Sequence, residues 1–183
     1  MTQIFTLQQV GIVLGLYLVI AYGLAAFRPD TYWNWLPRFP RSMVWGYVLT
    51  VIAMVWGGWL ISTVSLGEFA PLRNIFFFSA IVLCLLTAVF VPEFLAVRMS
   101  GILALLLAEP VLVAAYMRPE TTRLLVVVLA YGWIVCGLFF VGLPWLLRDW
   151  LTWGMASRAR FRAIGLSGFL YGIAILVCAV FIW

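Results

Sequence analysis

Histidine and lysine are absent from this sequence of 183 residues, and acidic residues are few. Without histidine the chain can form no HExxH zinc site, no bis-histidine haem and no Ser-His or Cys-His catalytic pair. Without lysine it can form no Schiff base with a carbonyl substrate. The aspartates, Asp30 and Asp149, lie outside the long apolar runs, so a pair of membrane-embedded catalytic aspartates is excluded. We therefore expect that the chain is not an enzyme.

Cysteine is also scarce, with 3 residues in the chain. Cys84, Cys136 and Cys178 each fall inside an apolar run, and none of them has the CxxC spacing that metal and redox sites use. Free cysteines of this kind usually behave as small buried hydrophobic side chains. We expect no metal site and no cofactor.

Charged residues are also few, since they make up 9% of the sequence, whereas hydrophobic residues make up 67%. An ordinary soluble domain carries roughly 25% charged residues, so this chain could not cover itself with polar surface. In lipid the backbone must bond internally, either as helices or as a closed barrel. Barrel strands alternate between polar and apolar residues, whereas the apolar runs here are long and continuous. The sequence predicts an all-α fold, a polytopic membrane bundle.

The length of the apolar runs predicts six transmembrane helices. A helix needs about 17 to 25 apolar residues to cross the hydrocarbon core, and the connections between the runs are too short to fold on their own. No basic residue precedes the first run, so we expect it to remain as a helix and not to be cleaved as a signal peptide. We predict one transmembrane domain, 1–183. Its spans are 10–27, 43–65, 75–91, 99–117, 124–147 and 164–183.

The basic residues predict the orientation. All 11 are arginines, and most of them lie in the first, third and fifth connections. Short cytoplasmic loops carry the excess of basic residues, so we predict that these connections face the cytoplasm and that both termini lie outside. In a bacterium the chain would be a multi-pass protein of the inner (plasma) membrane. Because the arginines set topology, we expect no nucleic-acid binding.

Two of the basic connections also carry aromatic residues, a combination that suits the lipid headgroup level. The first connection contains three prolines, which deny it a continuous helix. The last, Arg148–Ala163, can lie as an interfacial helix. Binding of anionic lipid is the simpler interpretation, and docking of a protein partner is the alternative. The candidate headgroup residues are Arg38, Arg41, Arg158, Arg160 and Arg162.

Glycine spacing indicates close helix packing at both ends of the chain. Gly11 and Gly15 form one GxxxG pair, and Gly168 and Gly172 form another. Such pairs let two membrane helices approach backbone to backbone. The pairs either pack the first and last helices within this bundle or hold another subunit or a second copy.

Glu109 is the one acidic residue within the predicted spans, which contain no arginine, and it lies near the middle of the fourth. An ionised carboxylate at that depth costs about 2.5 to 3.5 kcal/mol even on insertion scales. Glu109 must therefore be neutral, partnered or hydrated.

Two interpretations of Glu109 stay open. Pro110 removes the N–H that would bond the carbonyl of Leu106, and a protonated Glu109 can donate to that carbonyl. Alternatively, Glu109, Pro110 and Tyr131 form a small polar site for an ion, a proton or a substrate, since intramembrane acids are often functional.

Transport needs polar groups along a path, and the spans offer few beyond Glu109. Assembly with other membrane proteins needs only surfaces on which helices can pack. We therefore predict a non-catalytic subunit or scaffold of a membrane assembly, with the lipid bilayer, other membrane subunits or a second copy as partners. The alternative is a small transporter, channel or substrate-binding membrane component that uses Glu109.

Overall fold

The computed structural model describes residues 6–64, 66–90, 92–116 and 118–183. The fold is all-α, as predicted, and no strand occurs in these ranges. The helices are α1 (Leu7–Phe27), α2 (Pro29–Trp33), α3 (Met43–Thr63), α4 (Arg73–Phe90), α5 (Leu95–Ala115), α6 (Leu124–Gly142), α7 (Trp145–Met155) and α8 (Arg158–Phe181), with 3-10 turns η1 (Phe39–Arg41), η2 (Gly67–Leu72) and η3 (Thr121–Arg123).

Six helical segments in the described part of the chain are long and apolar enough to cross a membrane. Each has 21 to 24 residues, which at 1.5 Å per residue gives roughly 32 to 36 Å, against a hydrocarbon core of about 30 Å. The predicted six-helix fold is confirmed, and it is compatible with a multi-pass integral membrane protein. The side of the membrane on which the termini lie stays a prediction.

Two helix limits near the last connection differ from the predicted ones. α6 ends at Gly142, before the predicted limit at Leu147, and α7 begins at Trp145. Pro144 lies between them and accounts for the break, since proline lacks an N–H and disfavours a helical residue before it. α8 begins at Arg158, so the last arginines belong to its first turns and not to the connection.

Elsewhere the limits agree more closely. The first connection forms two short pieces, α2 and η1, and no continuous helix, as its prolines predict. α5 begins at Leu95, earlier than the predicted start at Met99. Three predicted span ends, Ser65, Val91 and Met117, lie outside the described residues.

The chain divides into two compact units, which are described separately. One contains the residues up to Pro37, Leu107–Val135 and the residues from Arg148 onward, and the other contains Arg38–Leu106 and Cys136–Leu147. α5 and α6 each contribute residues to both units. The predicted single domain stays a prediction.

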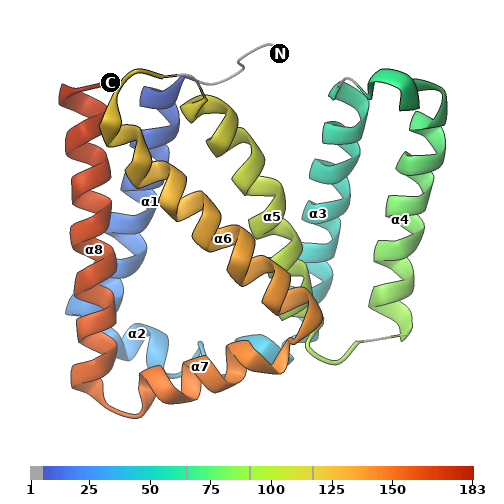
Figure 1. Cartoon of the computed structure of the whole chain (residues 1–183). Coiled ribbons are helices and arrows are strands. Elements are labelled where there is room, and N and C mark those ends of the chain that lie inside the picture. The colour runs from blue at the N-terminus through green and yellow to red at the C-terminus, as the bar shows by residue number, and fades with distance from the viewer. Residues whose placement is uncertain (1–5, 65, 91, 117) are drawn as a thin grey trace. The chain divides into compact units, whose positions relative to one another are not determined.

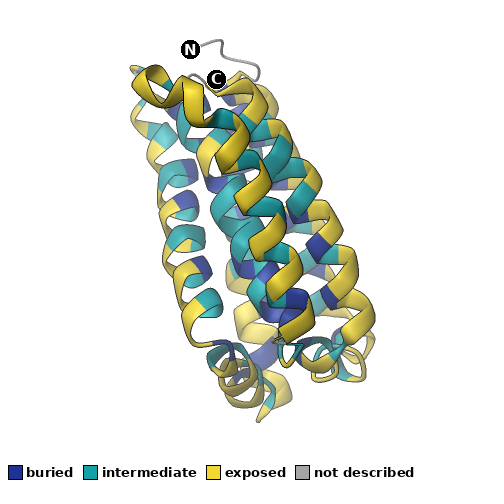
Figure 2. Ribbon diagram, turned by 90° about the vertical axis from the view of Figure 1, so that its right-hand side faces the viewer, coloured by how far each residue is buried: buried dark blue, intermediate teal, exposed yellow. Residues whose placement is uncertain are grey.

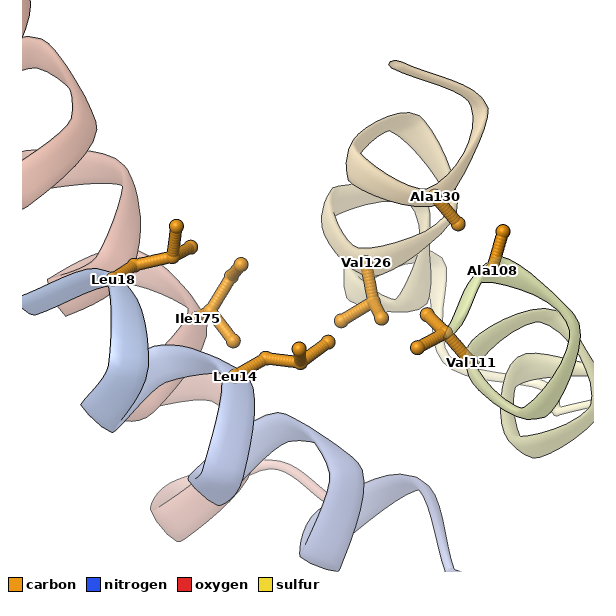
Figure 3. Packing of buried hydrophobic residues seen from close by; sticks show 7 residues of the cluster. All are labelled: Leu14, Leu18, Ala108, Val111, Val126, Ala130 and Ile175. Carbon is orange, nitrogen blue, oxygen red and sulfur yellow. The ribbon is translucent and has the colours of Figure 1, made fainter. Parts of the chain in front are cut away.

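The core of the first unit lies where α1 and α8 meet the parts of α5 and α6 that belong to it. The side chains point toward one another from all four helices (Figure 3). Because these buried groups are aliphatic, dispersion and close fit hold the helices together in lipid, where burial of apolar surface gives little drive. The cluster consists of Leu14, Leu18, Ala108, Val111, Val126, Ala130 and Ile175.

α1 and α8 run side by side, and glycines line their contact (Figure 1). A Cβ on Gly15 would lie 2.5 Å from Cγ of Leu176, and one on Gly172 would lie 3.0 Å from the backbone nitrogen of Val19. Gly11 likewise faces the side chains of α8, and Gly168 faces the ring of Tyr22. The structure thus places all four GxxxG glycines between the first and last helices of one chain.

Three hydrogen bonds fasten the segment before and at the start of α6. The hydroxyl of Tyr171 donates to the carbonyl of Leu125 at 2.6 Å, and Nε1 of Trp183 donates to the hydroxyl of Thr122 at 2.8 Å. A guanidinium nitrogen of Arg123 donates to the carbonyl of Ala115 at 3.1 Å. The last bond satisfies a carbonyl at the end of α5, which the helix itself leaves open.

In the second unit α3 and α4 pack as an antiparallel hairpin (Figure 1). A small cluster of Ala88, Leu95 and Met99 is buried, and Gly46 lies against Leu95. Most of α4 is exposed, since only 6% of its most apolar stretch is buried. Exposed residues, yellow in Figure 2, recur along the helices, and in a membrane such apolar faces suit contact with lipid.

Candidate functional site

Glu109 lies on the outward face of α5. The residues of this helix that enter the core, Ala108, Val111 and Ala114, are buried, whereas Glu109 is exposed. With 3.6 residues per turn, Glu109 falls on the opposite side of the helix from Val111. α5 continues through Pro110, which is half-buried. The carboxyl thus lies on the side of α5 that faces away from the core of the first unit.

The serine and threonine hydroxyls of four spanning helices form hydrogen bonds within their own helix. Every serine and threonine that the structure describes within α3, α4, α5 and α8 donates to a carbonyl three or four residues back on its own helix. The donors are Thr50, Ser62, Thr63, Ser79, Thr87, Ser100 and Ser167.

Glu109 differs from these residues. Its carboxyl has no hydrogen-bond or ion-pair partner among the described residues. The expected bond to the carbonyl of Leu106 is therefore not formed in this structure. A carboxyl in hydrocarbon without a partner is costly, so at the depth predicted for it Glu109 would need to be neutral, hydrated or bonded to a group outside the described residues.

Tyr131 lies on α6 and is 57% exposed. The described residues supply no partner for its hydroxyl, and no hydrogen bond joins it to Glu109. The site of Glu109, Pro110 and Tyr131 for an ion, a proton or a substrate stays a prediction. No three Cys, Asp or Glu side chains gather within the described residues in a way that could hold a metal ion.

The candidate headgroup arginines are all exposed. Arg38 and Arg41 flank or end η1 in the second unit. Arg158, Arg160 and Arg162 follow one another along the first turns of α8 in the first unit. These positive charges lie at the N-terminus of α8, where the helix dipole is also positive, so the two repel each other. The first turn of α8 holds no acidic residue that would offset the repulsion. An anionic environment, such as a lipid surface, would relieve this charge.

Arg158 belongs to a cluster of polar and aromatic side chains. It pairs with Asp30 at 3.1 Å and stacks over the ring of Trp33 at 5.7 Å. Trp33 packs edge to face against Phe161, with ring centroids 5.9 Å apart. Both charged side chains are largely exposed, so the ion pair itself contributes little stability. The cluster chiefly fixes α2 against the start of α8.

Two further aromatic residues near this cluster, Trp153 and Tyr32, are fixed by contacts of their own. Arg160 stacks over the ring of Trp153 at 4.6 Å and donates to its carbonyl at 2.9 Å. The hydroxyl of Tyr32 donates to the carbonyl of Ala21 at 3.2 Å. Burial, with a smaller contribution from Tyr17, raises the pKa of Tyr32, so this hydroxyl keeps its proton at neutral pH.

Several close approaches between helices were not predicted from the sequence. A Cβ on Gly165 would lie 2.7 Å from the backbone nitrogen of Ala26, and Gly101 faces Gly137 at similar range. Gly165 precedes the Gly168–Gly172 pair by three residues, a spacing that could have indicated the longer small face. Gly101 and Gly137 are single glycines in different helices, so no local spacing indicates them.

Some buried polar atoms in or near the connections also lack hydrogen-bond partners. Nε of Arg118 and Oε2 of Glu120 are buried without a hydrogen bond among the described residues, and Nε of Arg98 is in the same state. Such groups are uncommon in folded proteins and need a partner from water, lipid or protein.

Comparison with known proteins gave no match to a family model, to a curated protein or to a solved structure.

Proposed function

We propose that this chain is a non-catalytic subunit or scaffold of a membrane assembly, in the inner (plasma) membrane with both termini outside. The observation that carries the proposal is the exposed carboxyl of Glu109 without a partner among the described residues. Polar side chains in membrane helices act as contacts between helices. An outward-facing carboxyl therefore fits a surface on which another membrane helix is seated.

The same observation weighs against the transporter alternative. A transport path needs several polar groups that remain available to a substrate or ion. In this chain the serine and threonine hydroxyls of α3, α4, α5 and α8 are already bonded to their own helices. Glu109 has no such neighbours to share a hydrated path.

In this proposal the basic segment formed by α7 and the start of α8 positions the subunit in the membrane. Exposed arginines and tryptophans at the start of α8 and in α7 suit the headgroup region. Electrostatic attraction to anionic lipid adds about 1 kcal/mol per arginine near the surface. The arginines would hold the subunit at a fixed depth, at which Glu109 meets its partner.

Affinity isolation tests the proposal. The tagged chain is extracted from its native membrane in mild detergent, and Glu109→Gln and Glu109→Leu are isolated in parallel. We expect an assembly with the wild type and with Glu109→Gln, which retains a donor and an acceptor, and loss of the assembly with Glu109→Leu. A wild-type chain that is isolated alone while it catalyses uptake into vesicles would contradict the proposal and favour transport.

A further inference from the structure

Arg158 and Arg162 form an arginine pair at the end of α8 that lies beside α2 (Figure 1). They are four residues apart, which places their Cβ atoms about 5–6 Å apart on one face of the helix. Arg158 has an ion pair with Asp30 at 3.1 Å, and both of these side chains stay more than half exposed. Arg162 is exposed and has no hydrogen bond or ion pair with the described residues. The arginine pair therefore carries more positive charge than Asp30 neutralises.

Two further arginines of this segment are already engaged. Arg148 donates from Nε and Nη2 to one carboxylate oxygen of Asp149, at 3.0 and 2.9 Å. Arg160 lies on a different side of α8 from the arginine pair, where it stacks on Trp153 and bonds to its carbonyl. The arginine pair, in contrast, shares a face on which several guanidinium N–H groups remain available to an acceptor.

An exposed apolar stripe continues along α8 from the arginine pair. Its members follow one another in steps of three and four residues, so they stay on one side of the helix, next to Arg162. The glycines that face α1 lie on another side of α8. From end to end the stripe is about 16 Å long, half of a hydrocarbon core of about 30 Å. It consists of Leu166 (44% exposed), Leu170 (63%), Ile173 (38%) and Val177 (48%).

We propose that the arginine pair and the stripe together bind one anionic phospholipid of the surrounding membrane, with its phosphate at the pair and an acyl chain along the stripe. Guanidinium groups bind phosphate oxygens through paired N–H donors. Acyl chains cross their leaflet in nearly the same direction as a spanning helix, and the stripe has the length of one leaflet. The inference deepens the lipid contact of the proposed function and rests on it.

The arrangement of charge and apolar surface determines the class of ligand. Positive charge lies at the end of a helix that is long enough to span the membrane, and exposed apolar surface follows it along the same helix. A phospholipid has the same order of headgroup and chain. The amine of a zwitterionic lipid would be repelled by the excess positive charge, so an anionic headgroup fits better. A free phosphate ion would use the arginine pair but leave the stripe without an occupant.

Lipid titration of the purified full-length chain tests the inference. Phosphatidylglycerol or phosphatidylcholine is added to the chain in detergent micelles, and native mass spectrometry counts the lipids that stay bound to the folded protein. We expect the wild type to bind its first phosphatidylglycerol more tightly than phosphatidylcholine. Arg162→Gln should weaken that binding about fivefold, from the usual attraction of one arginine to anionic lipid. Because Arg162 has no described ion pair or hydrogen bond to lose, this variant should fold as the wild type does.

Arg148→Gln is the matched control. It removes the same charge, but from a guanidinium that Asp149 already holds, so it should change the affinity less than about twofold. Free glycerol phosphate, added as its ammonium salt in excess over the lipid, should not displace phosphatidylglycerol, because it has no acyl chain for the stripe.

Three results would overturn the inference. They are equal binding of the two lipids, equal weakening by Arg148→Gln and Arg162→Gln, which would indicate diffuse attraction by charge alone, and displacement of the lipid by glycerol phosphate. Should affinity isolation still recover an assembly in any of these cases, the proposed function would stand and only the lipid site would be rejected.

Discussion

Gly101 and Gly137 meet backbone to backbone, and each blocks the space that a side chain on the other would need. A Cβ on Gly101 would lie 2.8 Å from the carbonyl oxygen of Gly137, and a Cβ on Gly137 would lie 2.8 Å from the carbonyl oxygen of Gly101. The contact brings α5 and α6 together in the second unit. Neither residue belongs to a GxxxG pair, so this reciprocal contact emerges only from the three-dimensional structure.

Alanine at either position should therefore destabilise the protein. We expect Gly101→Ala and Gly137→Ala each to cost about 1–3 kcal/mol, because the added methyl group meets backbone that cannot move aside easily. Thermal unfolding in detergent measures the effect. Gly132→Ala is the matched control, since nothing lies within 4 Å of a Cβ there, and it should be neutral or slightly stabilising. Equal loss in all three variants would contradict the contact.

The pair α1 and α8 gives a second prediction. Leucine at Gly15, Gly165 or Gly172 should leave insertion intact, because each span stays hydrophobic, but should separate the helices. Detergent stability measures the separation, and membrane fractionation measures insertion. Variants that insert and remain as stable as the wild type would show that the glycines do not determine the packing.

Tyr171 allows a test of one hydrogen bond. Tyr171→Phe removes the donor to the carbonyl of Leu125 and should cost about 0.5–1.5 kcal/mol of stability. Tyr131→Phe removes the same atom from an exposed tyrosine that has no described partner, so it should be silent. A cost for Tyr131→Phe as large as that for Tyr171→Phe would indicate that the Leu125 bond contributes nothing specific.

The orientation gives a further prediction. Reporters fused after Trp183 or within Leu66–Asn74 should lie outside, and reporters within Arg148–Ala163 should lie in the cytoplasm, because the arginines are concentrated in the connections predicted to be cytoplasmic. At each position, two fusions are compared, one with a reporter that is active only in the periplasm and one with a reporter that is active only in the cytoplasm. The active reporter shows the side of the membrane on which that position lies. A cytoplasmic reporter after Trp183 would reverse the proposed orientation.

The sequence predicts the spans well because length and lack of charge decide which segments cross a bilayer. It predicts helix ends less well. The break at Pro144 divides a run that is continuous in hydropathy, and Arg158 begins α8 although its charge suggests a connection. A membrane helix can start in the headgroup region, where arginine is tolerated.

The outward position of Glu109 was not predictable from sequence. A helix that is apolar on all sides gives no periodicity from which its inner face can be read. Ala108, Val111 and Ala114 enter the core because small residues let helices approach, but similar small residues occur on other faces of the spans. Only packing against α1, α6 and α8 determines which side of α5 faces away from the core of the first unit.

The mass of the particle released from the membrane tests the central claim, that Glu109 is met by a partner outside the chain. Polymer-bounded discs can be cut from the membrane without detergent, and their protein mass can be determined for the wild type, Glu109→Gln and Glu109→Leu. The account predicts particles heavier than one 20.6 kDa chain for the wild type and for Glu109→Gln, and single chains for Glu109→Leu. Single, folded chains for all three proteins would contradict it.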